Sequence, residues 1–144
     1  MEDQQRLNNL LNEINAYSQQ AELIKQQIEM IQASISEIDA LTNTLDDLEG
    51  KDSTEAFVPV GAGSFMKGEL KSTDEIIVSI GSGLAIKKDA DGAREIMAGQ
   101  KEDLNDSLDK MLANLQQVTD IVGNLQAQAE QIAAAAQGNM TQMG

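Results

Sequence analysis

The segment FVPVGAGSFMK, residues 57–67, decides the fold, because its glycines can be read in two ways. Two glycines, a serine and a lysine after an apolar run suggest a phosphate-binding loop. Such a loop needs a lysine directly after its last glycine and a helix straight after the loop. Here a strand-like run, residues 65–70, follows, and Lys67 comes four residues after Gly63. The segment is therefore predicted to be a β-hairpin, with a three-residue turn at Gly61-Ala62-Gly63.

A second segment of the same kind follows it. The run IIVSI, residues 76–80, is joined to LAIK, residues 84–87, by Gly81-Ser82-Gly83, which is predicted to be another three-residue hairpin turn. Alternate residues of a strand point to the same side, so Ile76, Val78 and Ile80 share one face. Four short strands cannot bury both faces alone, and their open edges pair readily with other chains. The middle of the chain is thus expected to form an obligate oligomer.

On both sides of this middle part, apolar residues recur at alternating steps of three and four. The first series runs from Leu7 to Leu45 and the second from Met97 to Ala136. This heptad pattern is typical of a coiled coil. Gly50 is expected to end the first helix, and Asp89 or Asp91 to cap the second. The predicted parts are a helix at residues 1–49, two hairpins at 50–88 and a helix at 89–144, in a single structural domain.

Matched seams at opposite ends of one chain favour an antiparallel hairpin of helices, in which facing residue numbers have a constant sum. A sum of 146 places Tyr17 opposite Ala129. It also places Ala21 opposite Leu125, so that large side chains meet small ones in both layers, as close packing requires. A sum of 139 instead places Ala21 opposite Val118. We prefer the sum of 146.

The composition excludes several functions. The net charge of −14 argues against binding to nucleic acid or to an anionic membrane. Cysteine and histidine are absent, which removes disulfides, thiolate metal sites and imidazole bases. No nucleophile, base or metal-binding set converges, so we expect no enzyme, no metal and no cofactor. The polar, acidic N-terminus is unlike a signal peptide and no apolar run could span a membrane, so we expect a cytoplasmic protein.

The middle segments VPVGAGSF, residues 58–65, and IIVSIGSGL, residues 76–84, resemble those of α-type subunits of prefoldin, an ATP-independent chaperone. The flanking heptads extend the resemblance over nearly the whole chain, and it is closest to the archaeal members. Two hairpins rather than one mark the α type. The resemblance implies a hexamer of two α and four β subunits. Its strands form a β-barrel, and its coiled coils hold non-native proteins at their tips and pass them to a group II chaperonin.

The resemblance also implies two sets of site residues. The residues expected to assemble the subunits, the last five of them facing a barrel interior, are Val58, Val60, Phe65, Ile76, Val78, Ile80, Leu84 and Ile86. The residues expected to bind clients lie at the distal helix ends, 1–14 and 129–144. They are Leu7, Leu10, Leu11, Ile14, Ile132, Met140 and Met143.

The residues leave three alternatives open. Leu7, Leu10, Ile14 and Ile132 belong to the heptad seams and could be packed between the helices, whereas Leu11 lies off the seam. Met140 and Met143 follow the last clear heptad and could belong to a disordered tail. The coiled coil itself is equally compatible with a structural assembly or tethering protein that binds one defined partner.

Overall fold

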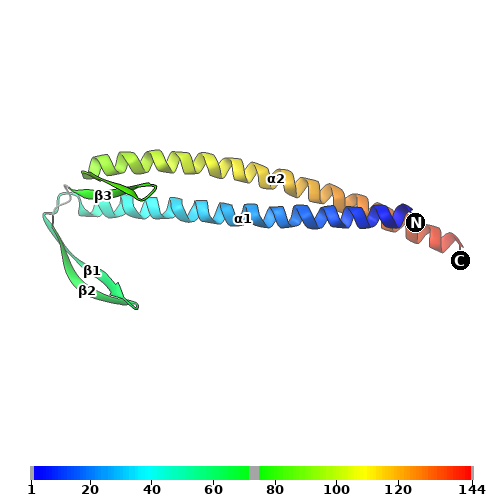
Figure 1. The fold of residues 1–144 in the computed structure, drawn as a ribbon, viewed down its shortest axis with the longest axis horizontal. Coiled ribbons are helices and arrows are strands. Elements are labelled where there is room, and N and C mark those ends of the chain that lie inside the picture. The colour runs from blue at the N-terminus through cyan, green and yellow to red at the C-terminus, as the bar shows by residue number, and fades with distance from the viewer. Residues whose placement is uncertain (1, 72–74, 144) are drawn as a thin grey trace. The chain divides into compact units, whose positions relative to one another are not determined.

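The computed structural model describes the backbone of residues 2–71 and 75–143, and side chains as far as residue 136. Helix α1, Glu2–Leu48, is followed by two separate two-stranded sheets and by helix α2, Ala90–Met143 (Figure 1). The predicted order of helix, hairpin, hairpin and helix is therefore confirmed. The chain divides into two compact units, one of Met1–Ala33 with Asp106–Gly144 and one of Ser34–Asn105.

The two helices end where local chemistry satisfies their free backbone groups. Gly50 has a φ of 77°, and the Lys51 N–H donates to the Leu48 carbonyl at 3.1 Å, which closes α1. At the start of α2, the Asp89 carboxylate accepts a 2.7 Å hydrogen bond from the Gly92 N–H. Asp89 is thus the N-cap, a position worth about 1 kcal/mol of helix stability.

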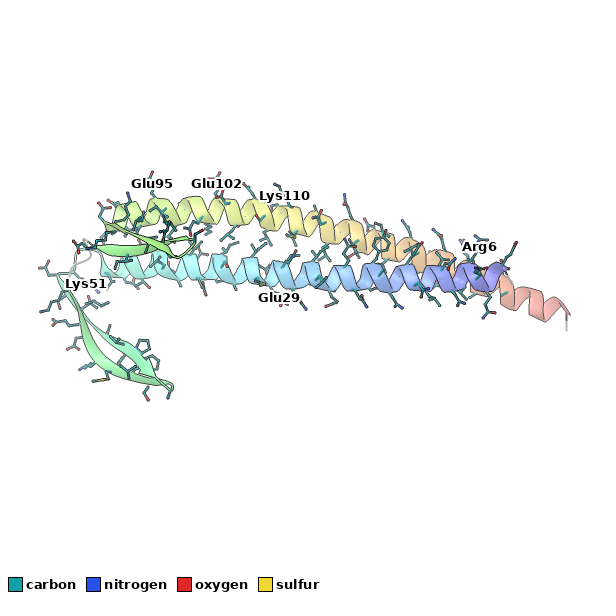
Figure 2. The ribbon with its side chains drawn as sticks, viewed as in Figure 1. Arg6, Glu29, Lys51, Glu95, Glu102 and Lys110 are labelled. Atoms are coloured by element: carbon teal, nitrogen blue, oxygen red, sulfur yellow. The ribbon has the colours of Figure 1, made fainter. Side chains whose placement is uncertain are left out.

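In the first unit, α1 and α2 pack through their heptad residues. Ile24, Ile28 and Val118 are buried, and the half-buried Tyr17, Ala21, Leu108, Met111, Leu115 and Val122 surround them. Charged side chains such as Glu29 and Lys110 point away from the partner helix (Figure 2). The seam predicted from the sequence is therefore the core of this unit.

The preferred register is wrong, and the alternative fits. Under the sum of 139, Ala21 faces Val118, and both belong to the core cluster, whereas Leu125, its partner under 146, does not. In the second unit, Asp39 lies 2.6 Å from the Lys101 ammonium. Under 139 Asp39 faces the neighbour of Lys101, but under 146 it would face a residue about 9 Å further along the helix. The sum of 146 was preferred because it matches large residues to small ones in two layers of the seam. The packing of the other layers and the ion pairs together favour the sum of 139.

The strands form two antiparallel hairpins. β1, Ser53–Gly61, pairs with β2, Ser64–Lys71, and β3, Ile76–Gly81, pairs with β4, Leu84–Lys88. Each turn has only two residues, Ala62-Gly63 and Ser82-Gly83, and all four have a positive φ, as in type I′ turns. The predicted three-residue turns are wrong because a register shift before each turn takes the first glycine into the strand. β2 follows the first turn directly, so no helix stands where a phosphate-binding loop needs one.

Candidate functional site

The β1–β2 hairpin has one apolar face. Val58 pairs with Met66 and Thr54 with Leu70 across the two strands, so these side chains share a face with Gly68. Val60 follows Val58 by two residues on β1, at the register shift before the turn. Val58, Val60, Met66 and Leu70 are all exposed. We call this set, Val58, Val60, Met66 and Leu70, the hairpin face. Exposed apolar side chains gathered on one face of a strand pair are suited to contact with another chain, and a role of this face in assembly stays a prediction.

The opposite side of the same hairpin is mixed. Glu55 and Lys67 form an ion pair at 3.5 Å, and the Ser53 hydroxyl donates to the Glu69 carboxylate. Nearer the turn, Phe57 and Phe65 stand on this side and are also exposed. Val58, Val60 and Phe65 are predicted from the sequence as one assembly set, but the strand pairing puts Phe65 on the face opposite Val58. Phe57, Met66 and Leu70 were not predicted, although Met66 and Leu70 follow the alternation that identifies a strand face.

The β3–β4 hairpin is attached to its own subunit. Val78 is only 3% exposed and packs in a cluster with Ile38, Leu45, Ala93 and Met97, which come from α1 and α2. Ile76 packs against the same cluster. The sequence predicts that Val78 faces a barrel interior. The helices of the same chain already cover it here, and a role for Val78 in assembly stays a prediction.

The remaining residues of this hairpin are only partly covered. Ile86, the cross-strand partner of Val78, is half-buried, whereas Ile80 and Leu84 near the turn are exposed. On the other face Ile77 is 71% exposed. A role in assembly stays a prediction for Ile80 and Leu84, and Ile77 joins them as an exposed apolar residue that the sequence analysis did not select.

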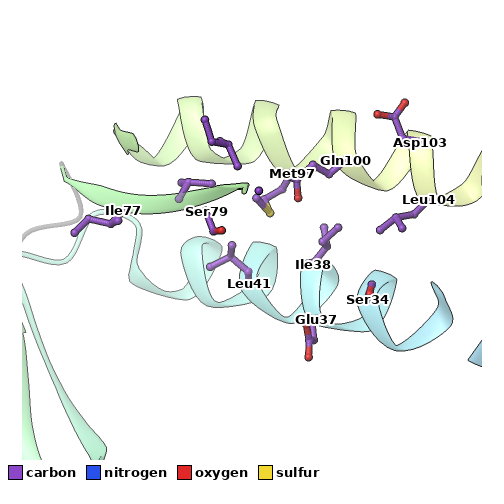
Figure 3. A pocket seen from close by; sticks show the side chains of 13 residues that line it. Ser34, Glu37, Ile38, Leu41, Ile77, Ser79, Met97, Gln100, Asp103 and Leu104 are labelled. Carbon is purple, nitrogen blue, oxygen red and sulfur yellow. The ribbon is translucent and has the colours of Figure 1, made fainter. Parts of the chain in front are cut away.

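A groove of about 680 Å³ lies beside β3 in the second unit (Figure 3). Ile38 and Leu41 of α1 and Met97 of α2 line it together with residues Ile77 to Gly81 of the strand. The carboxylates of Glu37 and Asp103 belong to its lining as well. The docked hairpin therefore leaves open space beside Val78 and does not seal the helices completely.

Arg94 ties the start of α2 to the end of α1. Its guanidinium lies 2.9 Å from the Asp46 carboxylate, 3.1 Å from Glu49 and 3.0 Å from Asp91. The hydrogen bond to Glu49 raises the pKa of Arg94, and partial desolvation opposes it. The surrounding carboxylates therefore favour the charged form of the guanidinium. Asp91 lies inside α2, so Asp89 and not Asp91 is the helix cap.

The predicted client-binding residues lie in the first turns of α1 and the last turns of α2, which both belong to the first unit (Figure 1). Leu11 is exposed, whereas Leu7, Leu10, Ile14 and Ile132 are half-buried at the seam. The side chains of Met140 and Met143 lie outside the described residues. The described side chains at the helix ends thus include the exposed Leu11 beside seam residues that are only half-buried. Their role in binding clients stays a prediction.

Four further apolar residues are exposed along the helices of the first unit. They are Leu23, Met30, Leu112 and Ile121. The sequence analysis did not select them, because it followed the seam and the helix ends. Leu23 and Met30 are seven residues apart, so they share a face of α1, and that spacing is the signal that would have found them.

The described residues offer neither a membrane span nor a metal site. Within residues 2–71 and 75–143, no helix combines the length and the apolar character that a membrane crossing requires. The same part of the chain holds no group of His, Cys, Asp or Glu side chains placed to bind a metal ion.

Comparison with known proteins matches this architecture. A family model described as prefoldin subunit matches residues 17–135. The prefoldin subunit alpha of Methanobrevibacter smithii is 75% identical over 144 residues, which is 100% of this chain and 99% of that protein. The prefoldin subunit alpha of Methanosarcina barkeri is 36% identical over 131 residues, 88% of this chain and 90% of that protein.

A solved structure supports the fold. A chain of filamentous PFD from Methanocaldococcus jannaschii aligns with a TM-score of 0.55 and 22% identity over 86% of this chain and 98% of that chain. Prefoldin is a chaperone family and not an enzyme family. The family model covers most of the sequence, and the two relatives match over nearly their whole lengths. The chain therefore belongs to the prefoldin family, in which the relatives named here are archaeal alpha subunits.

Proposed function

We propose that this chain is a subunit of a hexameric, ATP-independent chaperone that captures non-native polypeptides and delivers them to a group II chaperonin in the cytoplasm. The carrying observation is that the chain presents apolar side chains in two different ways. The hairpin face of β1–β2 is exposed as a set, whereas the end of the first unit combines the exposed Leu11 with seam residues that are half-buried. The first suits permanent assembly and the second suits transient contact.

Assembly is proposed to involve β subunits of prefoldin, with two α and four β subunits in the complex. Val58 pairs with Met66 across the two strands, and Leu70 lies on the same face four residues further along β2. Covering such a surface removes apolar area from water at about 25 cal/mol per Å². A strand pair from another subunit can pack on this apolar face. Separately, β1 and β2 form a two-stranded sheet, so their outer edges can be extended by strands of another subunit. We propose that the strands of several subunits close into a barrel in this way.

Client capture is proposed to use the distal helix ends. Seam residues such as Leu10 and Ile14 are half-buried there, so modest fraying of the last turns exposes them beside Leu11. A non-native client exposes apolar segments. Contact with the helix ends removes both these segments and the apolar residues of the helix ends from water. A single helix pair offers little area, so the affinity arises from several subunits acting on one client.

The experiment compares the assembled complex with a complex whose α chains lack residues 1–12 and 133–144. Light scattering of a denatured protein diluted into buffer without ATP measures protection from aggregation. The trimmed complex should keep its native mass, because the hairpins are untouched, and should lose most of its protection.

Two results would contradict the proposal in different ways. Equal protection by both complexes would show that the helix ends do not bind clients. No protection by the full-length complex towards several unrelated clients, with tight binding of one folded partner, would instead favour the tethering protein. Internal deletion of one heptad in both helices serves as the control, since it shortens the coiled coil but keeps the ends.

A further inference from the structure

We propose that one side of the coiled coil in the first unit is a second contact surface for non-native polypeptide. This inference rests on the proposed function. The surface follows from the heptad positions of the two helices. In α1, Ala21 and Ile28 occupy position a and Ile24 occupies position d. In α2, Leu115 and Val122 occupy position a. In an antiparallel pair the g positions of both helices flank the same side of the seam, and the c positions lie next to them.

This side carries no charge over several turns. Positions g and c hold no charged residue from Ala16 to Met30 in α1, or from Asn114 to Gln128 in α2. Glu13 and Lys110 are the charged residues that bound it. The α1 portion is about 20 Å long. We call these g and c positions the uncharged face. In a chain with a net charge of −14, such a face is unusual and has a physical consequence for binding.

Large apolar side chains stand on this face in contact with solvent. Leu23 is 60% exposed and Met30 is 71% exposed, and Ile121 contributes from α2. The core of the unit does not need them, because Ile24, Ile28 and Val118 form it. Between the apolar residues, Gln20 and Gln27 are exposed and present amide groups.

The chemistry of the face fits an extended non-native chain. Glutamine offers both a donor and an acceptor, so it can bond to either group of an unpaired peptide backbone. Leucine and the flexible methionine contact apolar side chains of many shapes. Absence of charge means that neither acidic nor basic clients are repelled. A surface that binds a basic folded partner would instead carry carboxylates. This chain has carboxylates in excess, but outside the uncharged face.

The face is also continuous with the proposed client-binding end. Beyond Gln128 the only charged residue of α2 is Glu130, and residues 131–144 carry none. A client held at the end can therefore extend along α2 and across to Leu23 and Met30 without meeting a run of carboxylates. Contact along this length would add to the avidity of the ends.

The other side of the same coiled coil supplies a matched control. Leu112 is an exposed leucine at position e of α2, close in exposure to Leu11. Lys25 and Glu22, which pair at 3.4 Å, lie on that side of α1, as does Glu29. An exposed leucine among charged residues thus tests whether exposure alone is sufficient.

The experiment places a photo-crosslinking amino acid at position 23, 30 or 112 of the full-length chain in the assembled complex. Denatured client is captured, the sample is irradiated, and crosslinked products are identified by mass. Positions 23 and 30 should give at least threefold more client crosslinking than position 112. The double variant Leu23→Gln with Met30→Gln should speed client release several-fold, whereas Leu112→Gln should leave it unchanged.

Equal crosslinking at all three positions, or none at 23 and 30, would overturn the inference. Crosslinking of positions 23 and 30 to another subunit would also overturn the inference. It would show that the uncharged face contacts the coiled coil of a neighbouring subunit. The proposed function is judged separately by the protection that the complex gives. A complex that protects clients without crosslinks at 23 and 30 keeps that function and loses only this second surface.

Discussion

Replacement of Val78 by alanine tests whether the β3–β4 hairpin is part of the subunit core. Two buried methyl groups are removed, at about 0.8 kcal/mol each. The groove of about 680 Å³ beside Val78 lets neighbours relax, so a residual cavity of about 30 Å³ adds roughly 0.7 kcal/mol. The free energy of unfolding should fall by about 2 kcal/mol, roughly a 30-fold change in the folding equilibrium.

Urea unfolding of the isolated chain, followed by far-ultraviolet circular dichroism, measures this change. With a slope of about 2 kcal/mol per molar urea, the midpoint should fall by about 1 M. Ile77→Ala is the control, because Ile77 is a neighbour on the same strand but faces away from the cluster. Its effect should stay within about 0.5 kcal/mol. If Val78→Ala shifts the midpoint no more than Ile77→Ala does, the hairpin is not docked on its own helices, and its burial must come from other subunits.

Two further predictions concern the hairpin and the register. A methyl group added at Gly68 would lie 2.9 Å from Cγ2 of Val58, so Gly68→Ala should weaken assembly with partner subunits. The double variant with Val58→Ala should recover part of that loss, and native mass spectrometry measures the assembly in each case. Cysteines at positions 21 and 118 should be joined within one chain by a short thiol crosslinker, and cysteines at 21 and 125 should not; the reverse preference would restore the sum of 146.

The order of elements could be predicted because each one has a local signal. Steps of three and four identify both helices, Gly50 ends the first, and the paired glycines identify the two turns. The length of each turn was mispredicted because it depends on a register shift between the two paired strands. The sequence of one strand alone does not reveal that shift. The helix register was mispredicted for a related reason, since it depends on packing between residues far apart in the sequence, such as Ala21 and Val118.

The sequence predicted many of the residues of the candidate site, but it predicted less well what the face that carries them packs against. Alternation placed Ile76, Val78 and Ile80 on one face, but it could not tell whether that face meets the helices of the same chain or another subunit. The structure shows Val78 against α1 and α2. Residues off the seam, such as Leu23 and Met30, were missed because a search for a packed core passes over apolar residues that point to solvent.

The central claim is that the hairpin face of β1–β2 joins this chain to other prefoldin subunits, while β3–β4 belongs to the subunit itself. Native mass spectrometry of the Val58→Glu chain mixed with its β partner tests this most directly. The control is Lys67→Ser on the opposite side of the same hairpin, where only an exposed ion pair is lost. The account predicts a hexamer for the unaltered and control chains and free subunits for Val58→Glu, with unchanged helix content. A Val58→Glu chain that still assembles to full mass would contradict it.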